Sequence, residues 1–276
     1  MFIVDIFILV GMGYKISMVP FHYWTPDVYE GSPTPITAFF SVAPKIAGIA
    51  LLIRFIHNVF SFDIDIAQSF NWSIIIAVLS AITMTVGNFL AIKQSNIKRM
   101  LAYSSISHIG FIMMSLCVID DLSSILLYVF IYMFMNLGAF FIVIFAEERY
   151  GFKKFDDWNG FGYRVPVLAA MMALNMIALT GLPPTSGFIA KFYIFSDLIA
   201  SKEYYWLAIV GAINAVVSLY YYFKLLKHMY LNEPDNSANL ESEFSFNFIV
   251  ILFSIQSLVF YAYWGPLIEI INKIRL

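Results

Sequence analysis

Charge is scarce in this sequence. Of its 276 residues only 12% are Asp, Glu, Lys or Arg, whereas a soluble domain carries about 25%. Hydrophobic residues make up 61% and aromatic residues 18%, and aromatic side chains are typical anchors at membrane interfaces. The formal net charge of −2 says nothing about partners, and no nucleic-acid partner is expected. The composition predicts an all-α polytopic membrane protein in contact with the lipid bilayer.

Cysteine is nearly missing as well. Cys117 is the single cysteine, which excludes an intrachain disulfide and the paired spacings of a metal site. A redox cofactor held by thiolates is therefore not expected. The sequence also lacks a Walker loop, a dinucleotide-binding glycine motif and a nucleophile elbow. These absences argue against an active site of the kind found in soluble enzymes.

Long apolar runs dominate what is present. A helix needs roughly 20 apolar residues to cross a bilayer, and the sequence predicts about eight such transmembrane helices. The sixth is discontinuous, and connectors such as Glu147 to Arg149 and Lys153 to Asp157 are expected to be solvated. The predicted spans cover about residues 2–22, 34–56, 71–92, 101–119, 123–146, 165–200, 204–227 and 246–268.

Lysine and arginine are distributed unevenly between the two membrane faces. Nine lie on the side reached by the first span and four on the opposite side. Because cytoplasmic loops carry the excess of positive charge, the first side is expected to face the cytoplasm or the mitochondrial matrix. The nine are Lys93, Lys98, Arg99, Arg149, Lys153, Lys154, Arg164, Lys224 and Lys227, and the four are Arg54, Lys202, Lys273 and Arg275.

Two segments interrupt the helical pattern. Pro20 and Pro26 follow the first apolar run, and Pro183, Pro184 and Gly187 lie in the middle of the sixth. Proline removes a helical hydrogen bond and clashes with the preceding turn. Freed backbone groups at membrane depth need protein or water partners, so paired breaks indicate a transport site. The first break is equally consistent with a helix end followed by an interfacial loop.

Three lysines lie inside apolar runs of membrane length: Lys15, Lys45 and Lys191. An ammonium at bilayer depth costs at least about 2.5 kcal/mol, so such residues are rare and usually functional. Desolvation favours the neutral amine, which allows a buried lysine to take up and release a proton. A row of such lysines would form a proton relay. Alternatively, each side chain could extend its charge to the membrane interface.

Two other titratable residues lie in predicted spans. His108 follows Ser104 by one helical turn and is a further candidate for the relay. A lone histidine in a helix is also commonly a hydrogen-bonded packing residue. Asp197 is the only carboxylate deep in a later span, and it is expected near the interface rather than beside a lysine.

Four segments carry a family resemblance: residues 13–39, 41–47, 96–110 and 179–192. They closely resemble the antiporter-like subunit N family of respiratory complex I, NADH:quinone oxidoreductase. The resemblance covers nearly the whole chain, and residues 13–39 are the most specific part. The choice of subunit N over related subunits depends mainly on Trp24 to Tyr29 and on the spacing between Lys15 and Lys45.

The resemblance implies a fold with inverted repeats. The family has fourteen transmembrane helices, two inverted five-helix repeats and two broken helices, and this chain is similar to helices seven to fourteen. It would then contain one intact antiporter-like repeat and part of another. The implied division is 1–59 for the end of the first repeat, 71–230 for the second repeat and 244–276 for the C-terminal helix.

The resemblance also assigns roles to the lysines. Lys15, Lys45 and Lys191 fall on the lysines of helices seven, eight and twelve, which line a polar axis along the membrane plane. The helix-five glutamate that pairs with the helix-seven lysine has no counterpart here. We therefore expect either a separate chain that supplies the preceding helices, or a truncated reading frame.

The implied function is proton translocation in the bacterial or mitochondrial inner membrane, coupled to quinone reduction elsewhere in the complex. The partners would be other membrane-arm subunits of complex I. This chain would bind no cofactor, because NADH, FMN, iron–sulfur clusters and quinone belong to other subunits. A cation/proton antiporter subunit, a membrane-bound hydrogenase subunit and a non-conducting truncated scaffold are the alternatives.

Overall fold

The computed structural model describes residues 2–61, 72–118, 122–234 and 241–273. Within these ranges the regular elements are helices, apart from one isolated bridge between Asn96 and Lys154. The helices are α1 Phe2–Ile16, α2 Trp24–Gly31, α3 Thr34–Ser61, α4 Trp72–Ile92, α5 Ile97–Ser115, α6 Ser123–Tyr150, α7 Phe161–Arg164, α8 Pro166–Thr180, α9 Ser186–Ser201, α10 Tyr205–Leu231, α11 Phe244–Ala262 and α12 Trp264–Ile271.

The expected all-α membrane fold is confirmed. Helices α3, α4, α6, α10 and α11 are each long and apolar enough to cross a membrane, and α8 joins the preceding residues 156–164 through a 117° bend as a sixth candidate. The other expected spans are helical too. Taken one by one, these helices are too short or too polar to cross a membrane. Helix α1 has only a short apolar part, Ile6–Ile16, and the sixth span is broken into α8 and α9. Helix α5 is rich in serine.

Several boundaries differ from the predicted ones. The first span stops as a helix at Ile16 instead of continuing to residue 22, because Ser17 adopts a positive φ of 66° and Pro20 follows. Helix α5 begins at Ile97 instead of residue 101, because the Asn96 side chain caps the backbone N–H groups of Lys98 and Arg99. The boundaries expected at residues 71 and 119, and Arg275, lie outside the described residues.

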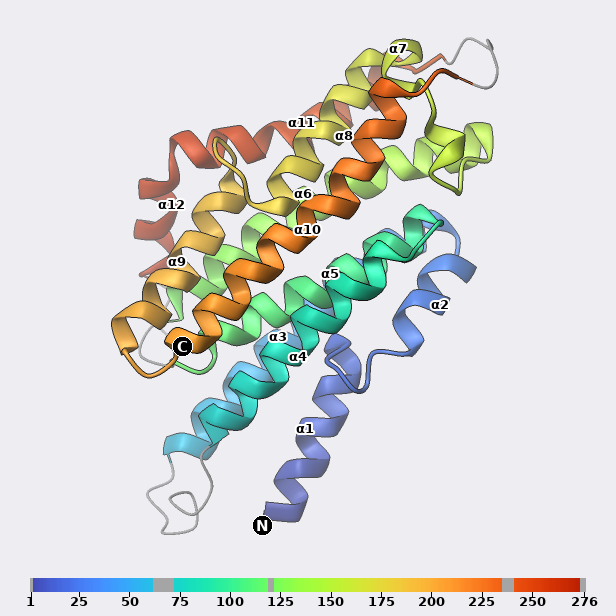
Figure 1. Ribbon diagram of the computed structural model, residues 1–276. Coiled ribbons are helices and arrows are strands. Elements are labelled where there is room, and N and C mark those ends of the chain that lie inside the picture. Colours follow the sequence, from blue (N-terminus) through green and yellow to red (C-terminus); the bar gives the residue numbers. More distant parts are fainter. Residues whose placement is uncertain (1, 62–71, 119–121, 235–240, 274–276) are drawn as a thin grey trace.

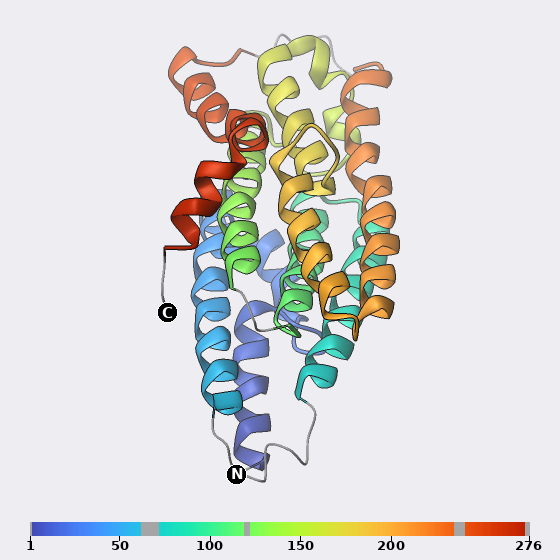
Figure 2. The same ribbon diagram turned by 90° about the vertical axis from the view of Figure 1, so that its left-hand side faces the viewer.

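The helices form an elongated bundle with α5 in its interior (Figures 1 and 2). Helix α5 packs against α2, α4, α6, α9 and α10, and all of its residues except Arg99 and Tyr103 are buried. A serine-rich helix at this position gives the bundle a polar interior, which is unusual because polar side chains at membrane depth need internal partners. Helix α5 is therefore the natural scaffold for a site.

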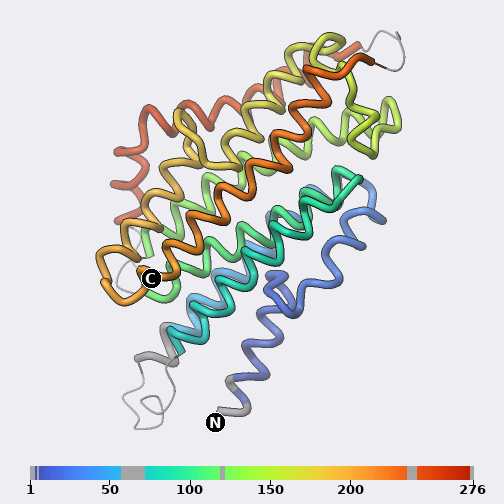
Figure 3. Tube along the Cα trace, in the orientation of Figure 1, coloured from blue at the N-terminus to red at the C-terminus, as the bar shows by residue number. Residues whose placement is uncertain are grey.

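The two interrupted spans run in opposite directions across the bundle. The trace passes from α1 into α2 along one direction and from α8 into α9 along the reverse, with an irregular segment between the halves of each (Figure 3). In the first break the indole Nε1 of Trp24 donates to the carbonyl of Tyr14 at 2.8 Å. The freed backbone group thus has a protein partner, as membrane depth requires.

Candidate functional site

Lys45 lies in the middle of α3, directly after Pro44, and is 1% exposed. Its ammonium Nζ donates to Ser105 Oγ of α5 at 2.5 Å. The same nitrogen lies 5.5 Å from the centroid of the Tyr29 ring, within the range of a cation–π contact. One hydroxyl and one ring face are sparse partners for a buried ammonium. The surroundings therefore suit a lysine that changes between its charged and neutral forms.

Lys191 lies in the second turn of α9, beside the break that separates α9 from α8. Its Nζ donates to the backbone carbonyl of Thr180 at 2.7 Å and to that of Leu179 at 3.3 Å. These carbonyls belong to the last turn of α8, where a helix end leaves acceptors unpaired and carries partial negative charge. The break thus creates the acceptors that hold the ammonium inside the bundle.

The break depends on two glycines. Gly181 adopts a φ of 83°, and a Cβ there would come within 2.7 Å of Cδ of Lys191. A Cβ at Gly187 would overlap the carbonyl oxygen of Ala178. The expected break residues Pro183 and Pro184 lie in the segment between these glycines, with exposed side chains. The sequence Gly-Leu-Pro-Pro-Thr-Ser-Gly therefore lets α9 approach the end of α8 closely.

His108 is 3% exposed and has a hydroxyl at each ring nitrogen. Nδ1 lies 2.7 Å from Oη of Tyr128 on α6, and Nε2 lies 3.2 Å from Oη of Tyr222 on α10. Oη of Tyr222 also lies 2.5 Å from Oγ of Ser104. The ring also lies tilted against that of Tyr132, with centroids 5.0 Å apart. Both ring nitrogens are therefore in direct contact with groups that can exchange protons.

Helix α5 brings Lys45, His108 and Lys191 into one neighbourhood. Ser105 contacts Lys45, His108 follows three residues later, and the ring of Phe111 lies 4.6 Å from Nζ of Lys191. Residues three apart on a helix are neighbours, so these contacts lie on successive turns. The structure thus joins three of the four candidate relay residues through a single buried helix.

Lys15 differs from the other two lysines. It lies in the last turn of α1, just before the first break, and its side chain is exposed on the surface of the described chain. Its stem lies beside Gly48 of α3, three residues after Lys45. Pro20 lies in the segment that follows α1, and Pro26 is buried in the first turn of α2. Lys15 is therefore next to the helix of Lys45, at an open face.

A second set of charged contacts, which sequence reasoning missed, lies at the start of α5. Lys98 is buried and its Nζ lies 3.0 Å from the carboxylate of Glu147, which also accepts a hydrogen bond from Thr34. Arg99 binds Asp27 and Glu30 of α2 at 2.7 Å each. The expectation that Glu147 belongs to a solvated connector is wrong, because Glu147 turns inward to Lys98. The only signal in the sequence for these ion pairs was the adjacency of the two basic residues, Lys98 and Arg99.

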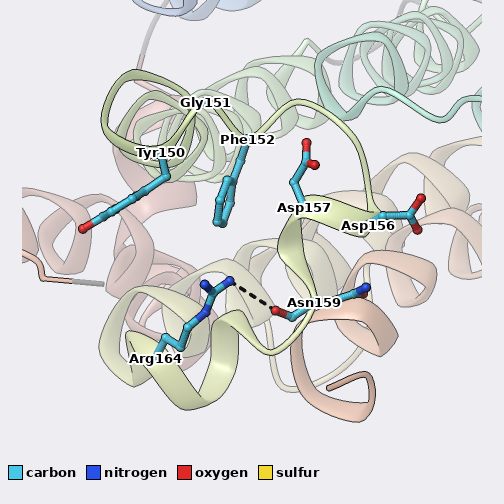
Figure 4. Close-up of a pocket in the computed structure, with 7 residues that line it drawn as sticks. All are labelled: Tyr150, Gly151, Phe152, Asp156, Asp157, Asn159 and Arg164. Carbon is cyan, nitrogen blue, oxygen red and sulfur yellow. Dashed lines mark hydrogen bonds between the residues drawn. The ribbon is translucent and has the colours of Figure 1, made fainter. Parts of the chain in front are cut away.

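Other polar features lie away from the lysines. Asp197 accepts a hydrogen bond from Ser115 at 3.5 Å near the end of α5. A pocket of about 200 Å³ lies among connector residues, where Arg164 Nη2 donates to the Asn159 carbonyl at 3.2 Å (Figure 4). In the part of the chain that the structure describes, no group of three or more His, Cys, Asp or Glu is placed to hold a metal ion. The buried polar line along α5 is therefore the candidate site.

Comparison with known proteins finds matches that cover most of the chain. The family model for "NADH:quinone oxidoreductase/Mrp antiporter, TM" matches residues 1–218. NADH-quinone oxidoreductase subunit N 2 of Sorangium cellulosum is 44% identical over 280 residues, covering 99% of this chain and 55% of that protein. Subunit N 2 of Chloroherpeton thalassium is 44% identical over 272 residues, covering 95% and 53%. The chain spans about half the length of these relatives.

Solved structures show the same fold. A chain of respiratory complex I from Thermus thermophilus matches with a TM-score of 0.79 and 27% identity, covering 95% of this chain and 57% of that chain. A chain of the Mrp complex from Dietzia matches with a TM-score of 0.85 at 19% identity, over 98% of this chain and 58% of that one, and this likeness shows the fold alone. The family-model match, the identities to subunit N and these folds together establish that the chain belongs to the NADH:quinone oxidoreductase/Mrp antiporter membrane family.

Proposed function

We propose that this chain moves protons across the membrane as part of an NADH:quinone oxidoreductase, through Lys45, His108 and Lys191, with Lys15 at its open end. The observation that carries the proposal is the contact of both buried lysines with one helix, α5, through Ser105 and Phe111. The subunit N relatives, at 44% identity, support this complex as its setting.

Coupling in this proposal is electrostatic. Each lysine carries a positive charge only while protonated, and His108 lies on α5 between Ser105 and Phe111, the residues that contact the two lysines. Opposite charges favour ionisation and like charges disfavour it. Protonation of Lys45 would therefore favour proton release from His108. The loss of positive charge on His108 would in turn favour the protonated form of Lys191. A charge change near Lys15, supplied by another segment or chain, would start the sequence through the adjacent helix α3.

The redox chemistry lies elsewhere in the proposed complex. NADH, FMN, iron–sulfur clusters and quinone would be used by other subunits, and this chain would contribute proton movement to their oxidoreductase reaction. Its partners would be other membrane-arm subunits and, at the exposed face of Lys15, a segment or separate chain that completes the first repeat. The relatives are bacterial, so the assembly is placed in the bacterial inner membrane.

The test is Lys191→Ala in the assembled complex. The ratio of protons pumped to NADH oxidised is measured in sealed membrane vesicles. We expect the ratio to fall while assembly is retained, because the variant removes a proton-carrying group and leaves the break intact. Lys153→Ala, which removes an exposed connector lysine, is the matched control. An unchanged ratio in Lys191→Ala would overturn the relay and favour the non-conducting scaffold.

One alternative is a subunit of a cation/proton antiporter or membrane-bound hydrogenase. It is favoured by the description of the matching family model, which names the Mrp antiporter beside NADH:quinone oxidoreductase. A coupled oxidoreductase pumps protons only while NADH is oxidised, whereas an antiporter exchanges protons for a cation gradient without NADH. Cation-driven pH changes in vesicles that contain the assembled complex separate the two.

A further inference from the structure

A groove of about 680 Å³ follows residues 220–231, the C-terminal part of α10. Apolar side chains such as Phe223 line it together with three basic ones, Lys224, Lys227 and His228. None of these residues belongs to the proposed relay. The groove therefore needs an explanation of its own.

An apolar stripe continues from the groove towards the middle of α10. Its side chains are each at least 43% exposed, and their spacing of three or four residues places them on one face of the helix. They are Ile209, Ile213, Val216, Tyr220 and Phe223. The stripe is about 21 Å long, more than the roughly 15 Å of one leaflet of the hydrocarbon core. Any lipid tail fits along it, so the basic residues decide which lipid binds.

Three lysines meet where α10 packs against the end of α4. Nζ of Lys224 donates to the backbone carbonyl of Gln94 at 3.2 Å and lies 4.3 Å from the centroid of the Phe155 ring. The preceding residue, Lys93, is exposed, and so is Lys227 one turn along α10. In the part of the chain that the structure describes, none of the three lysines forms an ion pair. Their positive charge is therefore uncompensated by these residues.

The basic groups of the groove differ in their availability. Nδ1 of His228 lies 2.8 Å from Oδ1 of Asn159 and 3.8 Å from Oδ1 of Asp156, so the connector engages this ring. An ammonium has three N–H donors, and Lys224 uses one of them on Gln94. Lys227 and the remaining donors of Lys224 are thus the groups that an anion can reach.

Positive charge beside an apolar stripe matches the chemistry of an anionic phospholipid. The groove lies at the end of the bundle that holds most of the nine basic residues, where the positive-inside rule predicts the cytoplasmic leaflet. Basic pockets on this side of a membrane bind anionic headgroups. A free phosphate would leave the stripe unused, and a helix of another protein would need carboxylates opposite the lysines.

We propose that α10 carries a binding site for one anionic phospholipid. Its phosphate lies at Lys224 and Lys227, and one acyl chain follows the stripe from Phe223 to Ile209. Because Lys224 is bonded to Gln94, the headgroup bridges the ends of α4 and α10. The site does not depend on the proposed proton relay.

The test is photo-crosslinking of the assembled complex in phosphatidylcholine nanodiscs. One sample contains a small fraction of phosphatidylglycerol with a diazirine in its acyl chain, and the other contains phosphatidylcholine with the same chain. Mass spectrometry locates the cross-linked peptides. We expect the phosphatidylglycerol probe to label residues 209–223 more strongly than the phosphatidylcholine probe.

Charge variants identify the headgroup contact. Lys227→Gln should lower the preference for phosphatidylglycerol by about fivefold, which corresponds to the attraction of one interfacial lysine for an anionic lipid surface. Lys153→Gln, which removes the same charge from an exposed connector lysine, should leave the preference unchanged. Raised salt should reduce the preference in the unmodified complex, because it screens exposed charges. This measurement decides the matter if Lys227→Gln fails to assemble.

Three results would overturn the proposal. Equal labelling by both probes would show that the stripe touches bulk lipid without a site. No labelling by either probe would show that another protein covers this face in the complex. A preference that neither Lys227→Gln nor salt reduces would reject the lysines as headgroup ligands. None of these readouts involves proton pumping, so a failure of the proposed relay leaves them unaffected.

Discussion

At the scale of single residues, the two buried lysines differ in how firmly they are held. Lys191 has two backbone carbonyls at the end of α8, and these acceptors cannot rotate away. Lys45 has the hydroxyl of Ser105, which is smaller and rotatable. A hydrogen bond to a charged group contributes about 1.5–3 kcal/mol, so the charged form of Lys45 depends strongly on this one contact.

This contact predicts the effect of Ser105→Ala. Without the hydroxyl, the charged form of Lys45 should be disfavoured by roughly tenfold or more, since 1.4 kcal/mol corresponds to a factor of ten. Proton pumping should fall, although every titratable side chain remains in place. The ratio of protons to NADH in vesicles measures it. Ser107→Ala, which removes another buried hydroxyl of α5, should leave the ratio unchanged; an equal loss in both variants would indicate general damage to α5.

The buried pair Lys98–Glu147 predicts a different result. Lys98→Met leaves the Glu147 carboxylate, which is only 16% exposed, with the Thr34 hydroxyl as a remaining partner, and removing one member of a buried pair costs up to about 3–5 kcal/mol. The yield and thermal stability of the assembled complex should drop, and Glu147→Gln in the same chain should restore part of both. Arg99→Met should cost less, about 0–1 kcal/mol, because its partners Asp27 and Glu30 are exposed. Equal losses would contradict this ranking.

At the scale of helices, the break in the sixth span places Lys191 of α9 against the end of α8. Gly187 allows α9 to pass against the last turn of α8, where its absent Cβ would meet the Ala178 carbonyl. Gly187→Ala should push α9 away and lengthen the contact between Lys191 and Thr180. Overpacking costs typically 1–3 kcal/mol, so thermal stability should fall together with pumping. Gly265→Ala, where nothing lies within 4 Å of the added carbon, is the control that should change neither.

Much of this arrangement could be predicted from local sequence. Apolar length located the spans, and proline and glycine located both breaks, because these signals act within one helix. Because Asn96 caps the helix, α5 begins one turn earlier than the apolar run predicts. A capping hydrogen bond is not visible in hydropathy alone. The pairing of Lys98 with Glu147 and the hydroxyls around His108 join segments far apart in the chain. Such contacts depend on how the helices pack, so no local pattern could give them.

At the scale of the whole molecule, the two ends of the bundle differ in their polar contacts. At one end Lys224 donates to the Gln94 carbonyl and Ile97 N–H to that of Lys153. At the other end Ser115 donates a hydrogen bond to Asp197. The first end holds connectors with most of the nine basic residues counted from the sequence. The positive-inside rule therefore predicts that this end faces the cytoplasm.

Labelling from one side of the membrane tests this orientation. The single cysteine, Cys117, is 5% exposed, and Cys117→Ser provides a background without a thiol. In that background Lys154→Cys places a thiol at the first end, and Glu203→Cys places one at the other, both at exposed positions. A membrane-impermeant maleimide should label Lys154→Cys only in inverted vesicles and Glu203→Cys only in intact cells, because nine basic residues against four oppose translocation of the first end. The reverse labelling pattern would show that the chain has the opposite orientation in the membrane. Helix α1, which carries Lys15, would then run towards the first break from the cytoplasmic side.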